Sequence, residues 1–312
     1  MIDEVSDIWF APDGWPIRRA RIDAGDGLAG KRGSLLFLSG RGDHMEKYAE
    51  TLGDWADRGW TVESFDWRGQ GGSGRLGADR MLGHVEDFES WIADLEAYGA
   101  EWQARTPGPH VMVGHSMGGH LLLRALAEKR VKADAVVLIA PMLGINAAGL
   151  PHALGGGIAA LACALGHADR ALWSSVHHEP ARVEALRNRL THSHARFEQE
   201  LHVRRERPEL VLDAPSWGWL RAAYRSIQWL ERPGVIEAIV TPVLILASRA
   251  DRLVTASAIA RMGRRLRHGQ MHFYGQEAAH EILREVDSVR DDALARIDAF
   301  LDEQAPPPEG RE

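Results

Sequence analysis

The segment Val111-Met-Val-Gly-His-Ser-Met-Gly-Gly119 decides the fold of this 312-residue chain. An apolar, β-rich run leads into Gly114-His-Ser-Met-Gly118, and a leucine-rich run typical of a helix follows directly. This order predicts a strand, a sharp turn and a helix, with Ser116 at the apex of the turn. The two glycines of the turn allow the strand and the helix to pack closely. The pattern therefore predicts a nucleophile elbow that exposes the Ser116 hydroxyl at the carboxyl end of the strand.

Strand-like and helix-like runs alternate on both sides of this elbow. A β-hairpin is expected over 7–22, and the later strands are expected over 34–38, 61–67, 110–113, 135–140, 243–247 and 271–274. The expected helices cover 46–58, 86–105, 121–129, 256–266 and 286–301. Alternation of this kind predicts an α/β fold with a mostly parallel central sheet flanked by helices.

The alternation stops between residues 146 and 238, where the sequence is helical in character and lacks a strand of core quality. We therefore expect a core built from residues 1–145 and 239–304, with 146–238 inserted as a helical lid over the carboxyl ends of the strands. Residues 305–312 are expected to form a disordered tail, because their composition is rich in proline and charge.

Two segments of this insertion, 149–165 and 216–229, are candidates for peripheral membrane contact. The first is apolar but broken by glycines, and the second places tryptophans beside arginines, a combination that suits a lipid boundary. The alternative interpretation is that Trp217, Trp219 and Trp229 pack the insertion onto the core and line an apolar tunnel.

Composition restricts the partners and the compartment. A net charge of −7 argues against nucleic acid as a partner, and the single Cys163 excludes an internal disulfide and fits a reducing compartment. No run of about 18 apolar residues is present, and the acidic start of the chain lacks the pattern of a secretory signal. The sequence therefore predicts a cytoplasmic protein. We also expect no cofactor and no metal. The inner face of the membrane is a candidate location, and the oligomeric state stays open.

An elbow serine requires two partners. Its hydroxyl is a weak nucleophile until a histidine takes its proton, and the histidine requires an acid that orients it. Asp251 and His280 each follow a predicted strand, as Ser116 does, and the chain order Ser, acid, His is that of hydrolases with such an elbow. We interpret the neighbouring Glu277 and Glu281 as solvated charges.

Other conspicuous residues are given structural interpretations. His115 is expected to pack beside the elbow, and the histidines at 177–178 and 192–194 lack the spacing of a metal site. The run Gly69-Gln-Gly-Gly-Ser-Gly74 matches a dinucleotide-binding fingerprint literally, but no helix start follows it. A flexible loop is therefore predicted there.

The oxyanion formed during attack needs two backbone donors. The N–H of Met117 is one, and the loop Ser39-Gly-Arg-Gly42 supplies the other, most simply through the N–H of Arg41. The Arg41 guanidinium is a candidate for binding a substrate phosphate, and an ion pair with a nearby carboxylate such as Asp43 is the alternative. Trp217 and Trp219 complete the expected substrate-binding residues.

The elbow, Asp251, His280 and the loop Asp66-Trp-Arg-Gly-Gln-Gly-Gly-Ser-Gly74 together resemble those of monoacylglycerol lipases. The chain looks most like bacterial lysophospholipases of the α/β-hydrolase superfamily, over residues 9–301. The resemblance implies an α/β-hydrolase fold whose helical lid covers an acyl tunnel. Ser39 stands where the lipases have the histidine of a His-Gly-x-Gly oxyanion loop, and this difference favours the lysophospholipase side.

The function implied by this resemblance is that of a serine hydrolase. It would cleave the carboxylic ester of an acyl lipid, either a lysophospholipid or a monoacylglycerol, through an acyl-enzyme. The residue pattern leaves open a generic carboxylesterase, a thioesterase or a peptidase, because the same fold hosts all of them. A non-catalytic binding protein that kept the scaffold is the remaining hypothesis.

Overall fold

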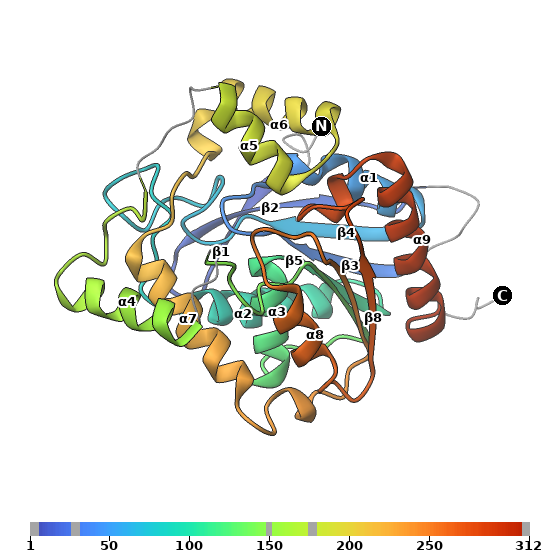
Figure 1. Ribbon diagram of the computed structural model, residues 1–312. Helices are drawn as coiled ribbons and strands as arrows, with labels where there is room; N and C mark the ends of the chain where they lie inside the picture. Colours follow the sequence, from blue (N-terminus) through green and yellow to red (C-terminus); the bar gives the residue numbers. More distant parts are fainter. Residues whose placement is uncertain (1–5, 26–31, 148–151, 174–179, 308–312) are drawn as a thin grey trace.

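A computed structural model describes residues 6–25, 32–147, 152–173 and 180–307. They form an eight-stranded sheet in the order β1-β2-β4-β3-β5-β6-β7-β8 (Figure 1). β1 and β2 are an antiparallel hairpin, β2 pairs antiparallel with β4, and every later pair of neighbours is parallel. The strands are β1 (Ser6–Phe10), β2 (Pro16–Ile22), β3 (Gly33–Leu38), β4 (Trp60–Phe65), β5 (His110–His115), β6 (Ala135–Ile139), β7 (Val243–Ser248) and β8 (Gly269–Tyr274). The predicted, mostly parallel sheet is confirmed.

Helices cover both faces of the sheet because the central strands are apolar on both faces. In β3, Leu36 and Leu38 belong to one core cluster, and Leu35 and Phe37 belong to the other, as the alternation of side chains along a strand requires. Figure 1 shows α2, α3 and α8 on one side of the sheet and α1 and α9 on the other. These helices are α1 (Ala49–Asp57), α2 (Glu89–Arg105), α3 (Met117–Ala127), α8 (Ala256–Gly263) and α9 (Asp287–Gln304).

The segment between β6 and β7 supplies the remaining α-helices of the described chain. They are α4 (His152–Ala164), α5 (Pro180–Leu190), α6 (His194–Glu206) and α7 (Trp217–Glu231). α4 packs against α7, whereas α5 and α6 lie together on the other side of the strand ends, near α1 (Figure 1). The described residues of this segment contribute isolated bridges but no strand to the sheet, as predicted.

The ends of several elements differ from the sequence prediction. The expected helix over 46–58 is divided into a short 3-10 turn, Met45–Tyr48, and α1. Ala305, placed in the predicted disordered tail, follows α9 directly and is buried, so ordered packing extends beyond the predicted boundary. Residues 308–312 of that tail lie outside the described residues. Within the described chain, no helix combines the length and the apolarity needed to cross a membrane.

Candidate active site

Ser116 lies at the turn between β5 and α3 in a backbone conformation that side chains rarely adopt. Its φ is 51° and its ψ is −114°, and its N–H donates to the Ile139 carbonyl at 2.9 Å. A Cβ at Gly118 would lie 2.3 Å from the Leu38 carbonyl oxygen, and one at Gly114 would lie 2.7 Å from the Cα of Gly119. Both predicted glycines are therefore sterically required, and the strained turn presents the serine hydroxyl at the strand end.

The structure brings the predicted serine, histidine and acid together from three loops at the carboxyl ends of β5, β7 and β8. His280 Nε2 lies 2.9 Å from Ser116 Oγ, and His280 Nδ1 lies 2.6 Å from Asp251 Oδ2. The other Asp251 oxygen, Oδ1, accepts the N–H groups of Leu253 at 2.7 Å and Val254 at 3.0 Å. This arrangement fixes the carboxylate, and it favours the tautomer with the proton on Nδ1 and a free lone pair facing the serine.

Electrostatics around the pair match the needs of a general base. Burial disfavours the charged form of Asp251, but the His280 imidazole and the two loop N–H groups outweigh burial, so the pKa of Asp251 lies below its ordinary value. Burial also disfavours the imidazolium of His280. The Asp251 carboxylate, with Glu281 and Asp43 further away, outweighs burial and raises the pKa of His280 above its ordinary value. His280 thus has a raised affinity for the proton that it would take from Ser116.

The histidine beside Ser116 packs as predicted. The His115 ring centroid lies 4.9 Å from that of His280 and 5.8 Å from that of Tyr48. Burial, and then the neighbouring His280, lower the pKa of His115 to about 3. His115 is therefore a neutral wall of the site at physiological pH.

No group of three or more potential metal ligands occurs among the described residues. His192 instead lies 3.0 Å from a Glu285 carboxylate oxygen, and His194 begins α6. The pair at 177–178 lies outside the described residues.

A buried ionic cluster behind the site escaped the sequence analysis. Lys47 Nζ lies 2.7 Å from Asp43 Oδ1, 2.5 Å from Glu281 Oε1 and 3.3 Å from Glu200 Oε2. Arg284 Nη1 lies 2.6 Å from Glu281 Oε2 and 2.7 Å from Glu200 Oε2. Burial lowers the pKa of Lys47, but the three carboxylates outweigh burial and raise it above the ordinary value. The interpretation of Glu281 as a solvated charge is wrong, because two cations share its buried carboxylate.

The same cluster holds the loop after β3. Asp43 Oδ2 accepts the N–H of Gly40 at 2.9 Å and the hydroxyl of Tyr48 at 3.1 Å, while Oδ1 binds Lys47. Gly40 immediately precedes Arg41, so the cluster fixes the segment from which the second oxyanion donor is expected. The spacing of Asp43 and Lys47 was visible in the sequence, but the contributions from α6 and from the residues after His280 were not.

The Arg41 side chain does not form the ion pair expected as the alternative to phosphate binding. Lys47 takes the Asp43 carboxylate, and Arg41 makes no ion pair within the described residues, so the Arg41–Asp43 alternative is wrong. Arg41 Nη1 donates instead to the carbonyl of Asp213 at 2.8 Å, and its guanidinium carbon lies 5.8 Å from the centroid of the Trp219 ring. Its backbone N–H has no hydrogen-bond partner in the described chain, nor has that of Met117.

Ser116 and His280 open on a cavity of about 390 Å³. Much of its wall is apolar and comes from the loop after β6, the segment after α4, α7 and the loop after β7, through Met142, Ile145, Leu172, Trp219, Leu220, Leu253 and Val254. The rest is charged and comes from the segment after β3, from α5 and α6 and from the residue after His280, through Arg41, Asp43, Lys47, Arg189, Glu200, Arg204 and Glu281.

The tryptophans of α7 separate into different roles. Trp219 lines the cavity. Trp217 does not, and its backbone N–H donates to the Arg170 carbonyl. Residues two apart on a helix point in nearly opposite directions, so both could not face one cavity. We therefore drop Trp217 from the substrate-binding residues. Trp229 packs against the core with the Arg124 guanidinium 5.7 Å from its ring centroid, as the packing alternative predicted.

The glycine-rich loop after β4 is held in place by hydrogen bonds to a buried residue. It wraps the buried Asp66 carboxylate, whose Oδ2 accepts the Gly72 N–H at 2.8 Å, and Ser73 Oγ donates to the Asp66 carbonyl at 2.7 Å. A Cβ at Gly71 would lie 2.3 Å from Asp66 Oδ2. The expected absence of a helix start is confirmed, but the expected flexibility is not supported, because these bonds tie the loop to the core.

Comparisons with known proteins give the family. The family model described as serine aminopeptidase, S33, matches residues 29–287. The chain is 31% identical to lysophospholipase L2 of Escherichia coli strain K12, over 88% of this chain and 81% of that protein. It is 27% identical to a probable lysophospholipase L2 of Haemophilus influenzae, over 87% of this chain and 84% of that protein.

A solved structure extends the likeness to the whole fold. The soluble variant of monoglyceride lipase from Saccharomyces cerevisiae superposes with a TM-score of 0.74 at 18% identity, covering 96% of this chain and 97% of that one. With the matched elbow, strand order and family model, the chain belongs to the serine aminopeptidase S33 family of α/β-hydrolases.

Proposed function

We propose that this protein hydrolyses the carboxylic ester of an acyl lipid, a lysophospholipid or a monoacylglycerol. The observation that carries the proposal is the hydrogen-bonded chain Ser116–His280–Asp251, which opens on a largely apolar cavity. A relative named as a lysophospholipase that matches most of the chain supports the same substrate class.

The chemistry proceeds in two halves. Ser116 Oγ attacks the ester carbonyl carbon while His280 Nε2 takes the hydroxyl proton, and the C=O electron pair moves onto the oxygen. When the tetrahedral intermediate collapses, the alcohol leaves with the proton from His280 and an acyl-Ser116 ester remains. Water then attacks that ester, giving its proton to His280, and the free fatty acid leaves as the Ser116 hydroxyl is restored.

The oxyanion is assigned to the backbone N–H groups of Met117 and Arg41. Both groups lack a hydrogen bond to the described protein, and both flank the nucleophile, Met117 in the next position and Arg41 beside Gly40. A Cβ on Gly40 would lie 3.2 Å from the Cβ of Ser116, so the loop runs against the serine. Donors fixed in this way stabilise charge only as it develops on the carbonyl oxygen.

An ester of a lipid fits the cavity better than the amino terminus of a peptide does. An aminopeptidase must neutralise an α-ammonium group with a free anionic group near the nucleophile. Each carboxylate in the cavity wall (Asp43, Glu200 and Glu281) is already bound by Lys47, and two of them also by Arg284. The wall therefore repels a cationic substrate, while the apolar side accepts an acyl chain.

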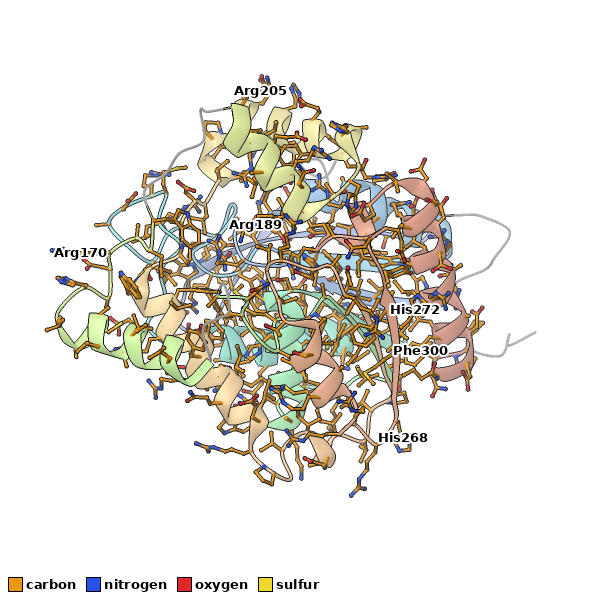
Figure 2. The ribbon with its side chains drawn as sticks, in the orientation of Figure 1. Arg170, Arg189, Arg205, His268, His272 and Phe300 are labelled. Carbon is orange, nitrogen blue, oxygen red and sulfur yellow. The ribbon has the colours of Figure 1, made fainter. Side chains whose placement is uncertain are left out.

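The inserted helices are assigned a lid role over residues 146–238, with α4 as the membrane-contacting element. Leu154, Ile158, Leu161 and Leu165 follow one another at helical spacing on its outer side, and all are exposed, Leu161 and Leu165 by more than three fifths. α4 has no charged residue, Trp173 beyond it is 54% exposed, and Arg170 lies at the same edge of the molecule (Figure 2). An apolar stripe beside an indole and a cation suits the boundary of a bilayer.

Two experiments test these assignments. Wild-type protein should react with a fluorophosphonate probe and hydrolyse p-nitrophenyl esters of two to sixteen carbons, with longer chains preferred. Ser116→Ala should lose both reactions while its circular dichroism is unchanged. Labelling that persists in Ser116→Ala would contradict the assignment of the nucleophile.

Membrane contact is tested separately by flotation with vesicles of phosphatidylglycerol and phosphatidylcholine. The double variant Leu161→Asp/Leu165→Asp should float much less than wild type. Val240→Asp is the matched control, because Val240 is equally exposed but precedes β7 at the opposite ends of the strands. Equal flotation of all three proteins would contradict the assignment of α4 as the membrane-contacting element.

A further inference from the structure

The charged wall of the cavity contains a cation that nothing in the described chain neutralises directly. The Arg41 guanidinium is held by a neutral carbonyl and a ring face, and the nearby carboxylates of Asp43 and Asp213 do not approach it within ion-pair distance. Burial lowers the pKa of Arg41 to about 10, although these two carboxylates oppose the effect. Arg41 is only partly exposed. A partly desolvated cation without a bound carboxylate is unfavourable, and an anionic ligand would offset that cost.

A second polar group beside Arg41 also lacks a partner. Trp219 is 6% exposed and lines the same cavity, and its indole Nε1–H has no hydrogen-bond acceptor in the described chain. A buried N–H without an acceptor is uncommon in proteins, and it marks a place where a ligand oxygen would fit. Arg41 and Trp219 lie against each other, so one ligand group could satisfy both.

The helices α5 and α6 add further positive charge to this side of the cavity. Arg189 near the end of α5 and Arg204 on α6 both line the cavity, and Figure 2 places Arg189 between this helix pair and the body of the sheet. Arg204 lies 3.1 Å from Glu200, but Lys47 and Arg284 already share that carboxylate. The cations of the wall thus outnumber its carboxylates.

We propose that Arg41, Trp219 Nε1, Arg189 and Arg204 form a phosphate subsite that binds the headgroup of a lysophospholipid. This inference rests on the proposed ester hydrolysis and adds the substrate class to it. A phosphate offers several acceptor oxygens to the planar guanidinium fork, which the hydroxyl groups of a monoacylglycerol cannot match in charge.

The position of Arg41 suits a substrate whose phosphate lies a short distance from the reacting ester. Its backbone N–H is the proposed oxyanion donor, and its side chain extends from there towards Asp213 and Trp219. An arginine side chain is comparable in length to the glycerol unit that separates the ester carbonyl from the phosphate. One residue would therefore contact both the reacting carbonyl and the phosphate of the same molecule, while the acyl chain occupies the apolar wall.

The test compares 1-palmitoyl lysophosphatidylglycerol with 1-monopalmitoylglycerol. Arg41→Met keeps the backbone donor and much of the packing on Trp219, so any disturbance of the oxyanion loop should affect both substrates equally. We expect the ratio of kcat/KM for lysophospholipid over monoacylglycerol to fall at least tenfold in Arg41→Met and about threefold in Arg204→Met. Arg205→Met is the matched control on the same helix, since Arg205 is exposed on the outer side in Figure 2, and it should leave the ratio unchanged. An unchanged ratio in Arg41→Met would overturn the proposal.

A binding measurement separates this inference from the catalytic assignment. In Ser116→Ala, glycerol 3-phosphate should raise the melting temperature more than glycerol does, and Arg41→Met in that background should abolish the difference. This shift does not require turnover, so it reports on the subsite even if the proposed hydrolysis fails. Inorganic phosphate that stabilises as strongly as glycerol 3-phosphate would assign the site to free phosphate and overturn the headgroup assignment.

Discussion

Replacing Lys47 with methionine removes the centre of the buried ionic cluster while keeping most of the side-chain volume. The Lys47 side chain is 5% exposed, and its ammonium nitrogen lies within 3.3 Å of carboxylate oxygens of Asp43, Glu200 and Glu281. Breaking a buried ion pair by removing one partner costs about 3–5 kcal/mol, because a charge is left uncompensated. Arg284 still binds two of the three carboxylates, so we expect the lower limit, a loss of about 3 kcal/mol in the free energy of unfolding at pH 8.

If the loss of stability is electrostatic, it should become smaller as the pH falls. In the wild type, burial raises the pKa of Asp43, but Lys47 and His115 outweigh it, and the pKa lies below its ordinary value. The stability contributed by Asp43 is therefore present above about pH 4 and is lost as the pH falls through the lowered pKa. In Lys47→Met the largest opposing charge is gone, burial raises the pKa of Asp43, and protonation relieves the cost. The difference between the two proteins should thus shrink as the pH falls from 8 to 5.

Urea denaturation at pH 8 and pH 5, followed by tryptophan fluorescence, measures both quantities. Lys132→Met is the matched control, because Lys132 is exposed and should cost less than about 0.5 kcal/mol at either pH. Because Asp43 also holds the Gly40 N–H, kcat of Lys47→Met should fall several-fold with little change in KM. A loss below about 1 kcal/mol at pH 8, or a loss that does not change with pH, would refute the electrostatic reasoning.

Three other expectations concern the site. Asp251→Asn should reduce kcat by about 10⁴-fold without unfolding, because the amide presents the wrong imidazole tautomer; a loss under tenfold in steady-state kinetics would exclude Asp251 as the acid. The logarithm of kcat/KM should fall as the pH drops through the pKa of His280, above the ordinary value of about 6.5. Glu281→Gln should move that limb to lower pH, and the exposed Glu277→Gln should not, so equal shifts in both pH profiles would contradict the assigned cause. Gly118→Ala should prevent soluble folding, because the added Cβ would lie 2.3 Å from the Leu38 carbonyl oxygen. Gly157→Ala on α4 is the control, because its Cβ would have nothing within 4 Å. Similar melting temperatures for both variants would disprove the steric argument.

Much of the framework was predictable because it depends on local periodicity. The run before Ser116 is apolar on both faces of its strand, and only a sheet covered on both sides buries such a run. The convergence of Ser116, Asp251 and His280, the three proposed catalytic residues, was predictable for a related reason, because each follows a strand and the carboxyl ends of parallel strands meet at one edge. Boundaries were less predictable. Glu89 rather than residue 86 begins α2, and its N–H donates to the Asp87 carboxylate at 3.0 Å.

The sequence by itself determined the elbow, the parallel sheet, the order of Ser116, Asp251 and His280, and the helical insertion, since hydrophobic period and turn chemistry act over a few neighbouring residues. Only the tertiary structure decided the partners of charged groups. Glu281 and Glu200 are 81 positions apart by their numbering, yet the fold places both on Lys47 and Arg284, away from water. The Arg41 side chain does not bind Asp43, two residues away. It donates instead to the carbonyl of Asp213, which lies 172 positions further along the chain. The partner of an ion or of a buried donor depends on which distant segments share its solvent-free space, and no local pattern contains that information.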